Sequence, residues 1–220
     1  MDIKWHGHSC FTIKGQDATV VADPYDELGS KLPKFKADIV TLGDELAEGK
    51  GSVAEVEGEP KILDWPGEFE ISNVAIEAFS ADRFTKEGES NGTESGAGNV
   101  NIFLFAVDGI KVCHLSGLAH ELSDELLDRI GDVDVLLLPV GGGDVLDGKT
   151  AQKVMEAIEP RVVIPMYFTT GESKLNINGA GDFLKAVGKT ELAAQEKYSV
   201  SSKASLLEGT MEFVLLEAVS

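Results

Sequence analysis

Two continuous apolar runs in the second half of the chain most strongly constrain its fold. They are Val133–Val140, in which Asp134 is the one charged residue, and Val162–Met166, and neither alternates regularly between polar and apolar residues. Strands of this kind are buried on both faces, as in a parallel sheet covered by helices. Gly148–Ile158 lies between them with a helical pattern, and Pro160 follows its end. The order strand, helix, strand predicts a βα unit with a buried sheet.

Two further helices are expected around this unit. Ser123 precedes a segment with acidic residues in its first turn, and Gly131 follows its end, which is the pattern of a capped helix. Another helix is expected over Gly179–Val187. The remainder, 197–219, alternates weakly and is expected to supply closing strands.

The first half of the chain has the pattern of β-structure. Trp5–Ile13 and Ala18–Ala22 are apolar runs on either side of a glycine-containing turn. Further strands are expected at 61–63, 74–79, 101–107 and 111–115. The polar segment 83–99 is expected to be a mobile loop or a long hairpin tip. Strands followed by βα units predict one α+β domain over residues 1–220, with two sheets and helices outside them.

Composition limits the partners that the chain can take. The formal net charge of −19 repels nucleic acid and anionic lipid, so neither a nucleic acid nor a membrane partner is expected. No apolar run is long enough to cross a membrane, and the N-terminal sequence has no secretory pattern, so we expect a cytoplasmic protein. Cys10 and Cys113 lie in apolar runs and are expected to be buried free thiols.

Several short motifs occur in an order typical of one family. They are Trp5–Phe11, Val20–Pro24, Trp65–Glu70, Val112–Gly117, Leu138–Gly142 and Val163–Phe168. Together they resemble the UlaG-like branch of the metallo-β-lactamase-fold superfamily. The resemblance implies a four-layer αβ/βα sandwich with its site at one edge, between the ends of two sheets. It also implies that Asp23 supports the metal-binding loop from behind.

The metal-binding loop of that family reads His-x-His-x-Asp-His, and this chain differs there. The corresponding positions are Asp44, Leu46, Glu48 and Gly49. A catalytic zinc ion needs about three protein ligands and one open position for water. Since the loop has no histidine, a metal site of the family type is expected to be absent.

The remaining ligand positions of the family differ as well. Ala81 stands at the position of a later histidine, Gly117 at that of the bridging aspartate and Tyr167 at that of the final histidine. We therefore expect no cofactor and no catalytic residue. The main hypothesis is a non-catalytic protein that keeps the fold for binding or assembly.

The alternative is a hydrolase with a remodelled site that cleaves a phosphoester or a lactone. The carboxylates that could converge there are Asp23, Asp44, Glu45, Glu48 and Asp82. Clustered carboxylates can hold Mg²⁺, Mn²⁺ or Ca²⁺ through oxygen. The cofactor in this alternative is a divalent metal ion held by carboxylates. Glu45 and Glu48 could instead be solvated loop charges, as runs of charged residues usually are.

The residues expected to line a pocket at the former metal site are His8, Asp23, Asp44, Asp82, Gly117 and Tyr167. His8 is either a structural histidine or a ligand-binding group. His6 shares a face with His8 if that segment is extended, although two ligands alone are too few for a metal. The expected partner is an unidentified small molecule or a protein. A homo-oligomer is a third hypothesis, with an apolar edge near Trp65 or Phe168 as the interface.

Overall fold

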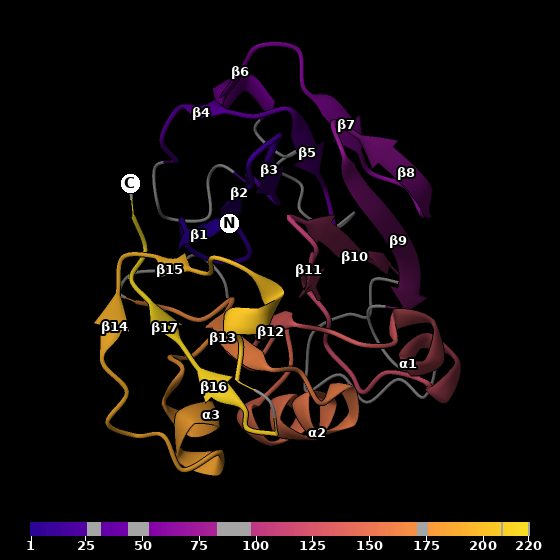
Figure 1. Cartoon of the computed structure of the whole chain (residues 1–220). Helices are drawn as coiled ribbons and strands as arrows, with labels where there is room; N and C mark the ends of the chain where they lie inside the picture. The colour runs from indigo at the N-terminus through magenta and orange to yellow at the C-terminus, as the bar shows by residue number, and fades with distance from the viewer. Residues whose placement is uncertain (26–31, 44–52, 83–97, 171–175, 208, 220) are drawn as a thin grey trace.

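Two sheets pack face to face in the computed structural model (Figure 1). It describes residues 1–25, 32–43, 53–82, 98–170, 176–207 and 209–219. The first sheet contains, in spatial order, β15 (Tyr198–Ser199), β1 (Asp2–Trp5), β2 (Phe11–Lys14), β3 (Thr19–Ala22), β5 (Ile39–Thr41) and β7 (Lys61–Leu63). Its pairing is antiparallel from β15 to β3 and parallel from β3 to β7.

The second sheet contains the buried runs of the second half of the chain. Its order is β16 (Glu212–Phe213), β13 (Val162–Met166), β12 (Val135–Pro139), β11 (Ile110–His114), β10 (Asn99–Val107), β9 (Val74–Asp82) and β8 (Gly67–Ile71). β11, β12, β13 and β16 are parallel, and β8 to β11 are antiparallel. Every residue of β12 and β13 is buried, which confirms the strand type predicted for these runs.

The described α-helices all lie beside the second sheet (Figure 1). They are α1 (Asp124–Ile130), α2 (Gly148–Ile158) and α3 (Gly181–Ala186). Ser123 caps α1 as predicted, because its side chain accepts a hydrogen bond from Leu126 N, and Gly131 ends the helix. The bounds of α2 match the prediction, since Asp147 caps it and Glu159 ends it in a left-handed conformation.

Short elements complete the fold. Strands β4 (Phe35–Lys36) and β6 (Val56–Glu57) pair with each other, as do β14 (Ala194–Gln195) and β17 (Leu215–Leu216). Two 3₁₀ turns, Val53–Glu55 and Lys203–Ser205, complete the described elements. No described helix is long and apolar enough to cross a membrane.

The main core fills the space between the sheets and beneath the helices. Its largest fully buried side chains include Trp5, Phe11, Phe103 and Phe105. A second cluster, Cys10, Val21, Leu32, Phe35, Val40 and Val56, involves the first sheet together with β4 and β6. Sheets sandwiched between outer layers confirm the predicted α+β class. In the described residues, however, β4, β6 and a 3₁₀ turn stand where a helical layer was expected.

The apolar run Trp5–Ile13 was predicted as one strand, and this is wrong. Gly7 and His8 both have positive φ, so the chain reverses between β1 and β2. His6 and His8 therefore do not alternate on one extended face. His6 instead bonds Val219 O through Nδ1 and the Thr12 hydroxyl through Nε2, each at 2.8 Å. The predicted loop at 83–99 lies almost entirely outside the described residues.

Candidate functional site

The candidate site lies at one edge, where strands from both sheets end. β3 and β5 are parallel, so their carboxyl ends meet at the same edge, and the same holds for β11 and β13. Hydrogen bonds join the two sheets there. Asn101 N donates to Gly43 O at 2.7 Å, and Tyr167 N donates to His8 O at 2.7 Å. This is the edge to which the family resemblance assigns the site.

Asp23 holds the chain at the point where the predicted metal loop begins. Its carboxylate is fully buried, and Oδ1 accepts a hydrogen bond of 2.7 Å from Gly43 N. Gly43 packs so closely that a Cβ built there would lie 1.9 Å from Ser116 Oγ. Asn101 binds the carbonyl of Gly43 from the other sheet. Both polar backbone groups of Gly43 are therefore fixed directly before Asp44.

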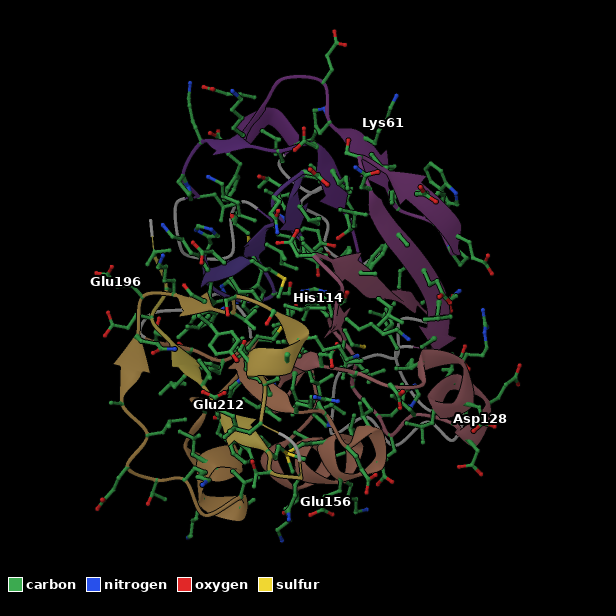
Figure 2. The ribbon with its side chains drawn as sticks, viewed as in Figure 1. Lys61, His114, Asp128, Glu156, Glu196 and Glu212 are labelled. Atoms are coloured by element: carbon green, nitrogen blue, oxygen red, sulfur yellow. The ribbon has the colours of Figure 1, made fainter. Side chains whose placement is uncertain are left out.

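His114 connects the two sheets beneath this point, near the centre of the molecule in Figure 2. Nε2 lies 2.8 Å from Ser9 O and Nδ1 lies 3.1 Å from Ser116 Oγ. Complete burial lowers the pKa of His114 to about 4, although the bond to Ser9 O opposes this shift. His114 is therefore neutral near pH 7. A neutral ring that donates to Ser9 O carries its hydrogen on Nε2 and leaves Nδ1 as an acceptor.

The Ser116 hydroxyl completes this buried network. It lies 2.7 Å from Asn101 O as well as 3.1 Å from His114 Nδ1, and its one hydrogen can go to either acceptor. Oδ2 of Asp23 lies 3.9 Å from the same Nδ1. The three side chains are fully buried, so this network positions the chain from beneath the edge.

Backbone strain gathers at the same edge. His8, Asp23, Ser116 and Tyr167 have φ values of 47°, 46°, 49° and 54°, in the left-handed region that side chains disfavour. The other described non-glycine residues with positive φ lie in hairpin turns or at a helix end: Ser72, Asn73, Asp108 and Glu159. His8 and Ser116 also lie in turns, which Cys10 N closes on Gly7 O and Leu118 N closes on Leu115 O. Left-handed non-glycine residues cost free energy, and they tend to cluster at functional sites.

His8 and Tyr167 form one side of the edge. Besides their backbone hydrogen bond, their rings meet edge to face with centroids 5.9 Å apart. Tyr167 is buried. Gly117 is also buried, in the turn that Leu118 N closes on Leu115 O. The structure thus brings His8 and Tyr167 together among the predicted pocket residues.

The predicted carboxylate cluster is only partly within the described residues. Asp82 is exposed at the end of β9, and its carbonyl accepts a hydrogen bond from the ring of His120. Asp44, Glu45 and Glu48 lie outside the described residues. Within the ranges that the structure describes, no three His, Cys, Asp or Glu side chains are placed to hold a metal ion.

The sequence did not predict that Gly43, Asn101 and Ser116 lie at this edge. A signal existed for Asn101, which is the polar residue of an otherwise apolar run and is buried. A buried amide must find partners, and Asn101 Nδ2 donates to Asp64 O at 3.0 Å. The roles of Gly43 and Ser116 depend on contacts between distant segments, which no local pattern predicts.

The comparisons with known proteins agree with this fold. Residues 2–167 match the family model described as Beta-lactamase superfamily domain. A protein of Anaeromyxobacter dehalogenans, named UPF0173 metal-dependent hydrolase, is 28% identical over an alignment of 233 positions covering 89% of this chain and 84% of that protein. One with the same name from Carboxydothermus hydrogenoformans is 27% identical, covering 77% and 85%.

Solved structures give the same result. A Thermotoga maritima protein, provisionally described as a Zn-dependent hydrolase of the metallo-β-lactamase superfamily, is 30% identical with a TM-score of 0.78 and covers 98% of this chain and 97% of its own. Igni18, a metallo hydrolase of Ignicoccus hospitalis, is 18% identical with a TM-score of 0.64, covering 91% and 99%. At that identity the second comparison shows the fold alone.

These relatives correct one expectation. The absence of a cofactor, inferred from the replaced ligand positions, is contradicted by relatives named metal-dependent hydrolases, which point to a divalent metal ion. The residues here do not fit a histidine-rich zinc centre, because Ala81 and Gly117 offer no ligand and Tyr167 only a buried phenol. The carboxylates of the sequence fit a hard cation that prefers oxygen. By fold and by the match over residues 2–167, the chain belongs to the β-lactamase superfamily and has the metallo-β-lactamase fold.

Proposed function

We propose that the protein is a hydrolase that depends on a divalent metal ion and cleaves a lactone or a phosphoester. The ion is hard, such as Mg²⁺ or Mn²⁺, and carboxylates following β5 hold it. Support comes from the family and from relatives named metal-dependent hydrolases. These relatives favour a hydrolase over the non-catalytic role expected from the missing histidines.

The observation that carries the proposal is the fixation of Gly43. Asp23 binds its N–H, Asn101 binds its carbonyl, and Ser116 packs where a side chain would stand. Each of these contacts comes from a different segment of the chain. Each buried polar group needs a hydrogen-bond partner. A simple connecting loop at this point would not require so many of them. Asp44 follows directly in the sequence.

Within this proposal the residues have separate roles. Asp44 and Glu48 are the candidate ligands by sequence position, and Asp82 is a further candidate at the end of β9. Asp23 is fully buried, and its role is to hold Gly43 through the hydrogen bond from the Gly43 N–H. A bound divalent ion would supply an acidified water and polarise the scissile group. His114 is neutral and buried, so its role is to position the chain.

A turnover assay tests the proposal. The protein is stripped of metal with a chelator, and Mg²⁺, Mn²⁺ or Zn²⁺ is then restored before hydrolysis of lactones and phosphoesters is measured. We expect turnover with Mg²⁺ or Mn²⁺ that is lost in Asp44→Ala and strongly reduced in Asp82→Ala. Asp17→Ala is the control, because Asp17 is an exposed carboxylate that bonds only Asn73 among the described contacts.

Two outcomes would overturn the proposed function. One is the absence of turnover with every metal and substrate while the protein remains folded. The other is turnover that Asp44→Ala and Asp82→Ala leave at the level of the Asp17→Ala control. The first result would favour a non-catalytic binding role for the protein.

A further inference from the structure

Trp65 is the exposed aromatic side chain of the described structure. The large hydrophobic residues that are exposed there are Ile62, Trp65 and Leu207, and half of the Trp65 surface (51%) is accessible to solvent. Single exposed aliphatic residues are common and need no explanation. Tryptophan is the largest apolar side chain and is enriched at binding hot spots. The position of Trp65 in the fold therefore shows whether it could contact a ligand.

Trp65 lies beside the candidate site. β5 and β7 pair in parallel with Thr41 opposite Leu63, and Leu42 N donates to Leu63 O at 2.9 Å. Asn101 bonds the segments that follow these two strands. Its N–H donates to Gly43 O after β5, and its Nδ2 donates to Asp64 O after β7. Trp65 follows Asp64 directly, so it stands at the same edge as Gly43.

The ring of Trp65 is held in place from one side. It meets Phe69 edge to face with centroids 5.8 Å apart, and Phe69 packs against the main core. Pro66 follows and restricts the backbone. A ring that is already ordered loses less conformational entropy when a ligand binds it.

Exposed acidic residues lie near Trp65 along the chain. Asp64 precedes it directly, and Glu68 of β8 follows three residues later, opposite Glu77 on β9. Among the described ion pairs, none involves these three carboxylates, although Arg129 lines the same hollow as Glu68 and Glu77. In a chain of net charge −19 this surface repels an anionic group.

We propose that Trp65 binds a flat, uncharged aromatic part of the substrate and thereby selects aryl-substituted lactones over phosphoesters. The location beside Gly43 places the ring at the site, and its ordered exposed face suits stacking. The adjacent Asp64 and the net charge of −19 disfavour a phosphate dianion. The assignment of a lactone as the cleaved group rests on the proposed function. The binding of an uncharged aromatic ring at Trp65 does not.

Three probes separate the contributions of ring and charge. Dihydrocoumarin carries an aromatic ring and a neutral lactone, δ-valerolactone lacks the ring, and phenyl phosphate carries the ring with a charged group. Binding is measured by calorimetry and by saturation-transfer NMR on the metal-free full chain, and again with Mn²⁺ present. The original protein is compared with the variants Trp65→Phe and Trp65→Ala. Leu207→Ala is the matched control, because it also removes an exposed hydrophobic side chain.

We expect dihydrocoumarin to bind more tightly than either other probe. Trp65→Ala should weaken its binding about threefold to tenfold, the range typical of one aromatic contact, while Trp65→Phe retains most of it. Leu207→Ala should leave it unchanged. Quenching of the tryptophan fluorescence gives a second readout, because the other tryptophan, Trp5, is fully buried.

Three results would overturn this inference. The first is that Trp65→Ala binds dihydrocoumarin as tightly as the original protein does. The second is that, without metal, phenyl phosphate binds as tightly as dihydrocoumarin. The third is that light scattering shows a homo-oligomer that Trp65→Ala dissociates. The last would make Trp65 a subunit contact. Dihydrocoumarin that binds at Trp65 but is not hydrolysed would contradict the proposed function alone.

Discussion

The carboxylate of Asp23 accepts a hydrogen bond of 2.7 Å from the backbone N–H of Gly43, and both groups are buried at the edge where the two sheets meet. This bond fixes the end of the strand that leads into Asp44. It also satisfies an amide group that water does not reach. Because the Gly43 N–H is buried, loss of the Asp23 carboxylate leaves this donor unsatisfied.

Removing the Asp23 carboxylate should destabilise the protein. Asp23→Ala leaves the Gly43 amide unsatisfied, and we expect the free energy of unfolding to fall by about 2–4 kcal/mol. Asp23→Asn keeps an oxygen acceptor and should cost less. Urea denaturation followed by circular dichroism measures both. Asp17→Asn, at an exposed carboxylate, should change stability by less than about 0.5 kcal/mol, and an equally small effect of Asp23→Ala would refute the anchoring role.

Any side chain at residue 43 should conflict with Ser116. A Cβ added to Gly43 would lie 1.9 Å from Ser116 Oγ and 2.9 Å from Asn101 O, so Gly43→Ala should cost about 1–3 kcal/mol. Adding Ser116→Gly removes the conflicting hydroxyl and the strained φ of 49°. The double variant should therefore recover part of the loss in a double-mutant cycle of unfolding free energies.

The matched control for this cycle is Gly181→Ala, because a Cβ there meets nothing within 4 Å. Its effect should be near zero or slightly stabilising, since alanine favours the helix that begins at this residue. If Gly43→Ala behaves like Gly181→Ala, or if the two substitutions at 43 and 116 prove strictly additive, the close packing described between these residues is not present in solution.

His114 should make stability depend on pH in the acid range. Its folded pKa of about 4 lies below the ordinary value of 6.5, because burial disfavours the charged ring. Protonation therefore favours the unfolded chain. The stabilisation is complete above pH 6.5 and is lost as the pH falls toward 4, by up to about 3 kcal/mol.

The contribution of His114 can be separated from that of the many carboxylates by comparison with His114→Gln, which does not titrate. Stability of both proteins is measured by urea denaturation from pH 7 to pH 4. The difference between their free energies of unfolding should shrink as the pH falls from 6.5 toward 4. A difference that stays constant would show that His114 titrates alike in the folded and unfolded chains.

Much of the fold could be predicted from local patterns. Ser123 and Gly131 mark the ends of α1 because capping depends on residues within one turn of each other. The runs at β12 and β13 are apolar throughout because both of their faces are buried. The reversal between β1 and β2 was missed because Trp5–Ile13 was treated as one apolar run, although Gly7 and Ser9 are residues that turns favour.

Less of the site could be predicted. The resemblance assigned Asp23 a supporting role, but its partners Gly43 and Asn101 come from other segments and become neighbours only when the two sheets pack. The expectation of no cofactor failed because it counted only the histidines lost from known positions. It gave too little weight to carboxylate oxygen, which is a sufficient ligand for hard cations.

Metal binding tests the central claim most directly. Chelator-treated protein is titrated with Mn²⁺ in a calorimeter, alongside Asp44→Asn with Glu48→Gln and the control Asp17→Asn. We expect saturable binding with one ion per chain in the original protein and the control, and loss of this binding in the double variant. No saturable binding, or binding that the double variant retains unchanged, would contradict a metal site built on the carboxylates that follow Gly43.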